Sequence, residues 1–311
     1  MKKLILLLFI AITGCTHSKN KQRELLKPID TSQLKKDLIA ITQTQKSRNY
    51  KNIKALDSVA YYIKTELNKV CDSVAYQKYS VNKNEYKNVI GSIGLQHKER
   101  IIIGAHYDVF GDSKGADDNA SGVAGLLELA RLLSKEKLKY RIDFVAYTLE
   151  EPPFFRTKQM GSYIHANYLF TAKIPVKGMI CLETIGYYND QPDSQEYPIK
   201  GMNLIYGNTG DFITVVQNEN SGEFGSQLKN LMQEQNLIST KAFKGTSALS
   251  GVDFSDHLNY WNFNYKAVMI TNTAFYRNKN YHKKSDILET LDLKKMNLVI
   301  EELYFAIKEI D

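Results

Sequence analysis

The sequence predicts an α/β fold, in which a mixed, mostly parallel central sheet carries helices on both faces. Short continuous apolar runs, typical of strands buried on both faces, occur at 101–105, 179–182 and 267–271. Between them lie segments with apolar residues at helical spacing, of which 122–133 is the clearest. Strands that alternate with helices favour a mostly parallel sheet that is covered on both sides.

The expected elements follow along the chain. Two helices come first, over 32–42 and 52–68, because each places its leucines, valines and isoleucines on one stripe. Further helices are expected over 122–133 and 293–310. The predicted strands are 76–81, 88–93, 101–105, 141–148, 179–182 and 267–271.

Length and composition indicate an ordinary globular protein. The 311 residues are about twice a usual domain length of roughly 150, which allows one large domain or two small ones. No internal repeat and no Pro/Gly-rich linker divides 31–311, so we predict a single domain there. The 43% hydrophobic and 24% charged residues exclude disordered, collagen-like and coiled-coil classes.

The charge of the chain gives little evidence for a nucleic-acid partner. There are 41 Lys and Arg residues against 34 Asp and Glu residues, a net charge of +7. The basic residues are dispersed in ones and twos, without a block interleaved with aromatic residues. We therefore predict no nucleic-acid binding.

The N-terminus is predicted to be a targeting segment. Lys2 and Lys3 precede nine apolar residues, 4–12, which are too few to span a bilayer that needs about twenty. This is the pattern of an export signal. The following Thr-Gly-Cys resembles a bacterial lipobox, in which Cys15 becomes the first mature residue and carries acyl chains; an ordinary cleaved signal is the alternative.

We thus expect a signal peptide over 1–14, a flexible tether over 15–30 and an exported lipoprotein anchored to a membrane by Cys15. The sequence leaves open which membrane face carries the anchor. Export implies an oxidising compartment, so Cys71 and Cys181 could pair. Two isolated cysteines are a weak disulfide signal, and we expect each to be a small buried residue.

Polar side chains gather where the predicted strands end. His106 and Asp108 follow the run 101–105, Glu150 and Glu151 follow 141–148, and Glu183 follows 179–182. Two more segments contribute, because Asp117 and Asp118 precede the helix at 122 and His282 follows the last strand. In open α/β sheets ligands bind outside the carboxyl ends of the strands, so these groups are expected in one crevice.

Such a concentration of carboxylates predicts bound metal. Neighbouring carboxylates repel and shift one another's pKa unless a cation neutralises them. Imidazole and carboxylate together suit zinc. The candidates outnumber the ligands of one tetrahedral site, and a carboxylate can bridge, so a pair of metal ions is expected.

The motifs resemble those of metallopeptidase family 28, the co-catalytic zinc aminopeptidases. They occur in the family's order over residues 88–292. The matching residues are His106-Tyr107-Asp108, the stretch 115–122 (GADDNASG), Glu150-Glu151, Met160-Gly161-Ser162, Ser255-Asp256-His257, and Tyr281-His282 with Asp286. The resemblance implies the zinc-exopeptidase fold.

The resemblance also implies roles. His106 and Glu183 would bind one zinc, Glu151 and His282 the other, and Asp118 would bridge the two. Glu183 departs from the family pattern, since well-studied members mostly have Asp at this position. Because of this difference, it stays open whether the second zinc site is occupied.

Four further residues complete the expected site. Glu150 would be the general base, and Tyr281 a hydrogen-bond donor to the developing oxyanion. Asp108 would orient the metal ligands without binding metal itself, and Asp286 would orient His282. Asp256 and His257 recur in the motif without being standard ligands, and we expect structural or substrate-lining roles for them.

The implied function is a zinc-dependent aminopeptidase that takes peptide substrates and two Zn²⁺ per chain. A glutaminyl cyclase shares the fold and much of the ligand set. A non-catalytic module, such as the peptidase-like domain of transferrin receptor, and an exported carboxypeptidase or amidohydrolase are further alternatives. We expect the insertions 152–160 and 186–226 to wall the substrate pocket. His165 is expected on a surface helix. Residue preference and oligomeric state are not predicted.

Overall fold

The computed structural model describes residues 31–311, so the predicted signal peptide, Cys15 and the tether lie outside the described residues. The helices are α1 Thr31–Thr42, α2 Ile53–Leu67, α3 Gly122–Leu133, α4 Gly161–Thr171, α5 Asn203–Tyr206, α6 Gly222–Gln235, α7 His257–Asn262 and α8 Leu293–Glu309. The strands are β1 Ser73–Val81, β2 Asn84–Ile93, β3 Arg100–His106, β4 Arg141–Tyr147, β5 Val176–Glu183, β6 Ile213–Gln217, β7 Thr240–Lys244 and β8 Ala267–Thr271.

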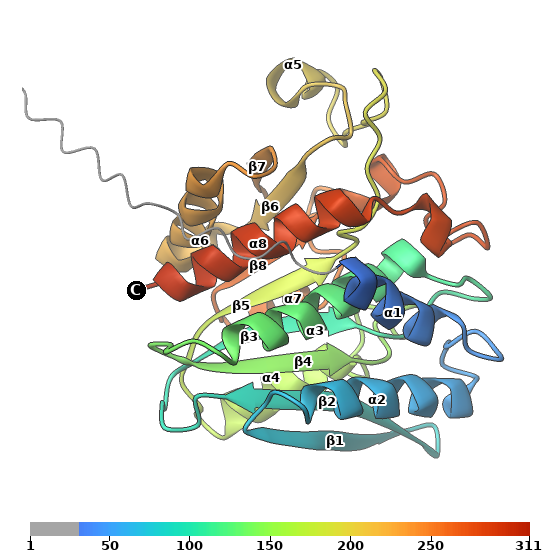
Figure 1. The fold of residues 1–311 in the computed structure, drawn as a ribbon, viewed down its shortest axis with the longest axis vertical. Coiled ribbons are helices and arrows are strands. Elements are labelled where there is room, and N and C mark those ends of the chain that lie inside the picture. Colours follow the sequence, from blue (N-terminus) through green and yellow to red (C-terminus); the bar gives the residue numbers. More distant parts are fainter. Residues whose placement is uncertain (1–30) are drawn as a thin grey trace, which may run out of the picture.

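All eight strands form one mixed sheet, in the order β1-β2-β4-β3-β5-β8-β6-β7 (Figure 1). The central strands β4, β3, β5 and β8 run parallel to one another. Antiparallel pairing occurs between β1 and β2, between β2 and β4, and between β6 and β8. The predicted fold class is therefore confirmed.

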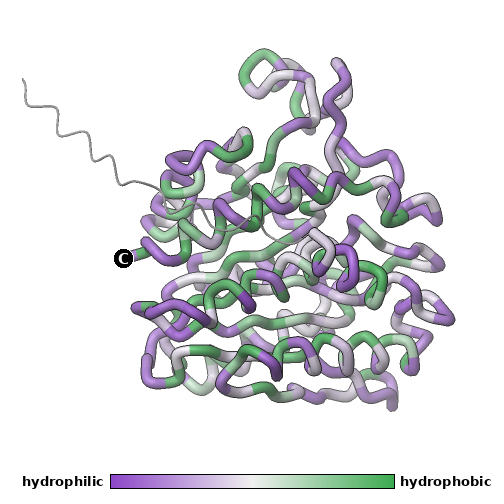
Figure 2. The backbone as a smooth tube through the Cα atoms, in the orientation of Figure 1, coloured by the Kyte–Doolittle hydropathy of each residue, from purple (hydrophilic) through white to green (hydrophobic). Residues whose placement is uncertain are grey.

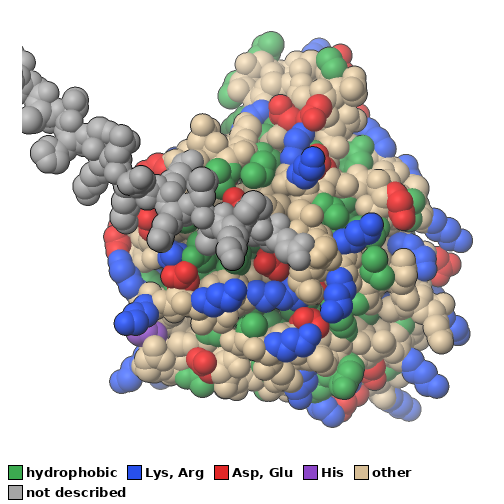
Figure 3. Space-filling model, viewed as in Figure 1, with side chains coloured by type: hydrophobic (Ala, Val, Ile, Leu, Met, Phe, Trp, Pro, Cys, Tyr) green, Lys and Arg blue, Asp and Glu red, His purple; other side chains and the backbone are tan. Residues whose placement is uncertain are grey.

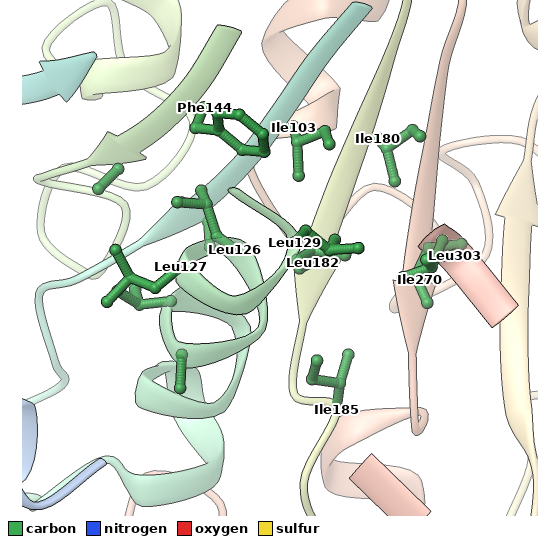
Figure 4. Packing of buried hydrophobic residues seen from close by; sticks show 14 of the residues in the cluster. Ile103, Leu126, Leu127, Leu129, Phe144, Ile180, Leu182, Ile185, Ile270 and Leu303 are labelled. Carbon is green, nitrogen blue, oxygen red and sulfur yellow. The ribbon is translucent and has the colours of Figure 1, made fainter. Parts of the chain in front are cut away.

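Helices cover both faces of this sheet. On one face, α1, α2, α3, α6 and α8 pack on the core (Figure 1). Successive residues of a strand point to opposite faces, so Ile103 and Ile180 meet Leu126 and Leu129 of α3 on this side (Figure 4). Figure 2 shows apolar stretches along the central strands and an alternation of apolar and polar residues along these helices. The other face carries α4 and α7, which cover Val145.

The chain between residues 186 and 226 differs from the prediction. We expected an insertion, but its second half contains strand β6 and the start of helix α6. Residues 213–217 are buried, so they belong to the sheet. Only the first half projects from the body, with α5 at the top of Figure 1.

The structure also bears on the expectations for His165, for the two cysteines and for the distribution of charge. His165 was predicted on a surface, and this is wrong: it is buried in α4, where its Nδ1 lies 2.6 Å from the Tyr260 hydroxyl. Cys71 and Cys181 are both free; Cys181 is buried as expected, whereas Cys71 is partly exposed, so the expected burial is wrong for Cys71. Figure 3 shows Lys and Arg interspersed with Asp and Glu on the face that it displays. Within 31–311 no helix is both long and apolar enough to cross a membrane.

Candidate metal centre

The predicted ligands come from five places in the chain. His106 ends β3 and Glu183 ends β5, while Glu151 lies in the loop that follows β4. These strands are parallel, so their carboxyl ends lie at one edge of the sheet. The turn before α3 contributes Asp118, and the loop after β8 contributes His282.

The ligand atoms fall into two groups that share Asp118. In the first, His106 Nε2 lies 3.3 Å from Asp118 Oδ1 and 3.3 Å from Glu183 Oε2. In the second, His282 Nε2 lies 3.2 Å from Asp118 Oδ2 and 3.1 Å from Glu151 Oε2. The structure therefore brings all five predicted ligands together, with one oxygen of Asp118 facing each group.

This donor set fits divalent metal. Atoms that bind one tetrahedral zinc ion at 2.0–2.2 Å lie about 3.3–3.6 Å from one another, close to the separations seen here. His282 Nε2 makes no hydrogen bond with the described residues, although two carboxylate oxygens lie near it. A cation shared by these atoms would satisfy them together. His106, Asp118 and Glu151 alone already form a buried group able to hold a metal ion.

Without a cation the site is electrostatically unfavourable for its carboxylates. Burial raises the pKa of Glu151 to about 7, and the charge on Asp118 adds to the rise. The pKa of Glu150 is raised well above its usual value by burial and by Glu151 and Glu183, while His106 opposes the rise. A divalent cation would remove this penalty, since it stabilises the ionised carboxylates.

Asp108 holds the two consecutive glutamates in place. Its Oδ1 accepts a hydrogen bond from the Glu150 amide at 3.2 Å, and its Oδ2 accepts one from the Glu151 amide at 3.1 Å. Its Oδ1 also lies 3.6 Å from His106 Nδ1. These contacts favour the orienting role that we expected for Asp108.

Asp286 has a different partner from the one expected. We predicted that it orients His282, but its carboxylate accepts hydrogen bonds from the backbone amides of Asp117 and Asp118, at 2.9 and 3.0 Å. The reason is that the 117–118 turn presents both N–H groups to one carboxylate. Asp286 thereby positions the shared ligand Asp118.

Ser255 and Asn119 hold Glu183, the ligand that departs from the family pattern. The Ser255 hydroxyl donates to Glu183 Oε2 at 2.6 Å. The Asn119 amide donates to the Leu182 carbonyl at 2.8 Å, next to Glu183 in the chain. The longer Glu side chain is therefore fixed at its end.

Aromatic rings sandwich the imidazole of His282. The Phe110 ring is stacked on it at a centroid distance of 4.4 Å, and the Tyr281 ring at 3.9 Å. Burial raises the pKa of Tyr281 well above its usual value, so its phenol stays protonated and able to donate a hydrogen bond. Sequence analysis identified Tyr281 but missed Phe110, because an aromatic residue in a loop carries no specific signal.

A buried arginine, Arg48, was also missed. It lies between α1 and α2, with 1% of its surface exposed. Its guanidinium donates to the carbonyls of Tyr107 and Gly115, each at 2.7 Å, and to that of Lys114. It thus ties both ends of the loop that separates His106 from Asp118.

The backbone is strained next to three functional side chains. Leu149, Thr184 and His282 have φ values of 62°, 50° and 59°. Non-glycine residues in this region cost about 1–3 kcal/mol each and persist where the surroundings enforce them. Leu149 precedes the glutamate pair and Thr184 follows Glu183. These strained backbone conformations therefore help to orient the ligand side chains next to them.

Two residues of the Ser255-Asp256-His257 motif lie beneath the site. Both Asp256 and His257 are buried. His257 Nε2 lies 2.8 Å from the Val252 carbonyl, which is a structural contact. Burial raises the pKa of Asp256 to about 7, with His106 opposing the rise.

Comparisons with known proteins agree on one family. The profile of peptidase family M28 matches residues 88–305. The protein YfbL of Escherichia coli K12 is 43% identical over 277 residues, which cover 86% of this chain and 85% of that protein. A probable leucine aminopeptidase of Arthroderma otae is 24% identical, covering 89% of this chain and 72% of its own length.

Solved structures show the same fold. The LapA aminopeptidase of Legionella pneumophila superposes with a TM-score of 0.70 at 21% identity, covering 90% of this chain and 72% of that one. A glutaminyl cyclase of Bacteroides thetaiotaomicron superposes with a TM-score of 0.69 at 17% identity, covering 92% and 100%. At these identities the likeness shows the fold alone.

Proposed function

This chain belongs to peptidase family M28, and on that premise we propose that it is a zinc aminopeptidase, which releases the first residue from peptides with a free N-terminus. The observation that carries the proposal is the pair of ligand groups that share Asp118, with Glu150 beside them. His106, Asp118 and Glu183 would hold one zinc ion, and His282, Asp118 and Glu151 the other. Zinc bound here would lower the pKa of water and polarise a carbonyl group.

In this proposal Glu150 is the residue that transfers protons. Its Oε2 lies 3.8 Å from His106 Nε2, and its side chain is almost fully buried. It accepts a proton from the attacking water and hands it to the departing amine. Its position is fixed by the hydrogen bond from its own amide to Asp108.

We assign to Tyr281 the stabilisation of charge on the substrate. Its ring packs on His282 and lines the cavity next to the ligands. In this proposal the phenol donates a hydrogen bond to the carbonyl oxygen as negative charge develops on it.

A panel of aminoacyl-anilides, each free and N-acetylated, tests the activity. Free substrates should be cleaved and acetylated ones spared, because an aminopeptidase needs a free amino group. Removal of metal by a chelator should abolish cleavage, and added Zn²⁺ should restore it. Equal cleavage of both substrate sets, or none of either, would contradict the proposal.

Glutaminyl cyclisation is the second candidate, because a cyclase has the same fold. Mass spectrometry of a peptide with N-terminal Gln separates the two reactions. Loss of ammonia would indicate cyclisation, whereas release of free glutamine supports the aminopeptidase.

We also propose that the protein is exported and anchored by a lipid on Cys15, as the basic and apolar N-terminal pattern supports. Cells grown with labelled palmitate should incorporate label into the protein. A Cys15→Ser variant should not. Label retained in this variant would refute the anchor.

A further inference from the structure

A cavity opens beside the candidate metal centre. The space between its walls is about 750 Å³, which includes the part open to solvent, and Glu183 and Tyr281 form the part of its wall that belongs to the centre. Residues of β8, β6 and β7 line its floor, and residues of the segment 195–206, which projects from the body in Figure 1, form another wall. If the chain is an aminopeptidase, as proposed above, this cavity receives the N-terminal side chain of the substrate.

The cavity wall is mainly apolar and aromatic. Its aromatic members are Tyr197, Tyr206, Phe212, Phe243, Phe254, Phe275, Tyr276 and Tyr281. Hydroxyl groups of this wall are largely used within the protein. Those of Tyr197, Tyr206 and Tyr276 donate to the carbonyls of Gly207, Ala242 and Ser250. Such a wall suits a large apolar or aromatic side chain.

Thr214 is the exception on the cavity floor. It is 5% exposed, and its Oγ1 is buried without a hydrogen-bond partner among residues 31–311. Alternation along β6 puts Phe212, Thr214 and Val216 on the cavity side, while Ile213 and Val215 point into the core on the other face. A buried hydroxyl that lacks a partner is costly, so a ligand that supplies one gains affinity.

The position of Thr214 relative to the metal centre decides which ligands can reach it. Glu183 is paired with Thr271 across β5 and β8, and Thr271 is paired with Thr214 across β8 and β6. Thr214 therefore lies two strands away from the ligand Glu183, about 10 Å at the usual spacing. A leucine side chain is too short to span this distance, whereas the hydroxyl of a tyrosine side chain lies at the far end of an aromatic ring and reaches further.

We infer that Thr214 makes the cavity selective for N-terminal tyrosine, whose phenol exchanges a hydrogen bond with Thr214 Oγ1 while its ring packs on the aromatic wall. With phenylalanine bound, Thr214 stays unpaired or traps a water molecule behind an apolar ring. One neutral hydrogen bond corresponds to a preference of about three- to tenfold for tyrosine over phenylalanine in kcat/KM.

The test compares Tyr-, Phe- and Leu-anilide in the zinc-loaded wild type and in Thr214→Val, which keeps the shape and removes the hydroxyl. The Tyr/Phe ratio should fall to about one in the variant, while hydrolysis of Phe-anilide is maintained. Thr65→Val makes the same chemical change at an exposed position of helix α2 and should leave the ratio unaltered.

A wild-type ratio near one, or a ratio that Thr214→Val does not change, would overturn the inference. Failure to hydrolyse any anilide would count against the proposed function instead. In that case calorimetric binding of L-tyrosine and L-phenylalanine gives the same comparison without turnover. Equal affinities, or equal effects of Thr214→Val on both, would then refute selectivity for the hydroxyl.

Discussion

Replacing Glu150 with Gln separates proton transfer from metal binding. The amide has nearly the same shape as the carboxylate but cannot accept the proton of water. A positioned general base contributes a factor of about 10²–10⁴, which corresponds to about 3–5 kcal/mol of the activation barrier. We expect Glu150→Gln to lower kcat by that factor.

The ligand groups explain why zinc should remain. The shortest ligand separations, 3.1–3.3 Å, join the other five side chains, whereas Glu150 Oε2 lies 3.8 Å from His106 Nε2. Both groups therefore keep every member in Glu150→Gln, and the zinc content at saturating Zn²⁺ should equal that of the wild type.

The assay measures kcat and KM on one anilide together with zinc content by mass spectrometry. Glu219→Gln is the matched control, because Glu219 is exposed and pairs with Lys244 at the surface. Turnover within tenfold of the wild type, or a loss of zinc that parallels the loss of turnover, would refute the role of Glu150.

Three other perturbations have defined outcomes. Phe110→Ala removes one ring stacked on His282, a contact worth about 0.5–1.5 kcal/mol, so the affinity for one of the two zinc ions should fall about three- to tenfold in a calorimetric titration. Arg48→Met leaves three carbonyls, two of them buried, without their donor and should lower the free energy of unfolding by about 3 kcal/mol or more in urea denaturation; an unchanged midpoint would contradict this. The metal-free protein should lose stability as pH rises from about 4 to about 8, because the pKa of Glu151 is raised to about 7 and that of Asp286 to about 8, in both cases chiefly by burial, from ordinary carboxyl values near 4 in the unfolded chain. A raised folded-state pKa gives stability that is lost on deprotonation, and thermal melts with excess zinc should show no such fall.

The sequence predicted the parts of the fold that depend on local pattern. The apolar runs that form β3, β5 and β8 are buried on both faces, so each strand could be predicted from its own residues, without knowledge of its neighbours in the sheet. Strand β6 was missed since its five residues include Thr214 and Gln217, and their burial depends on neighbouring strands and on the cavity.

The candidate ligands were predictable because they stand at strand ends or in short motifs. Several of their supporting residues were not, although Asp108 was. Arg48 binds carbonyls about sixty residues away, and such partners leave no local pattern. The burial of His165 was not predicted for the same reason, because its hydrogen-bond partner, the Tyr260 hydroxyl, comes from a helix that is distant in the sequence. The partner of Asp286 depends on the turn at 117–118, whose shape the sequence did not reveal.

The zinc content of wild type and Asp118→Ala, measured after dialysis against buffered Zn²⁺, tests the central claim most directly. Asp118 faces His106 with one oxygen and His282 with the other, so its loss should weaken both sites at once. We predict two zinc ions per wild-type chain and fewer than one in Asp118→Ala, with activity lost in parallel. A wild type that binds no zinc, or an Asp118→Ala variant that keeps two ions, would contradict the account.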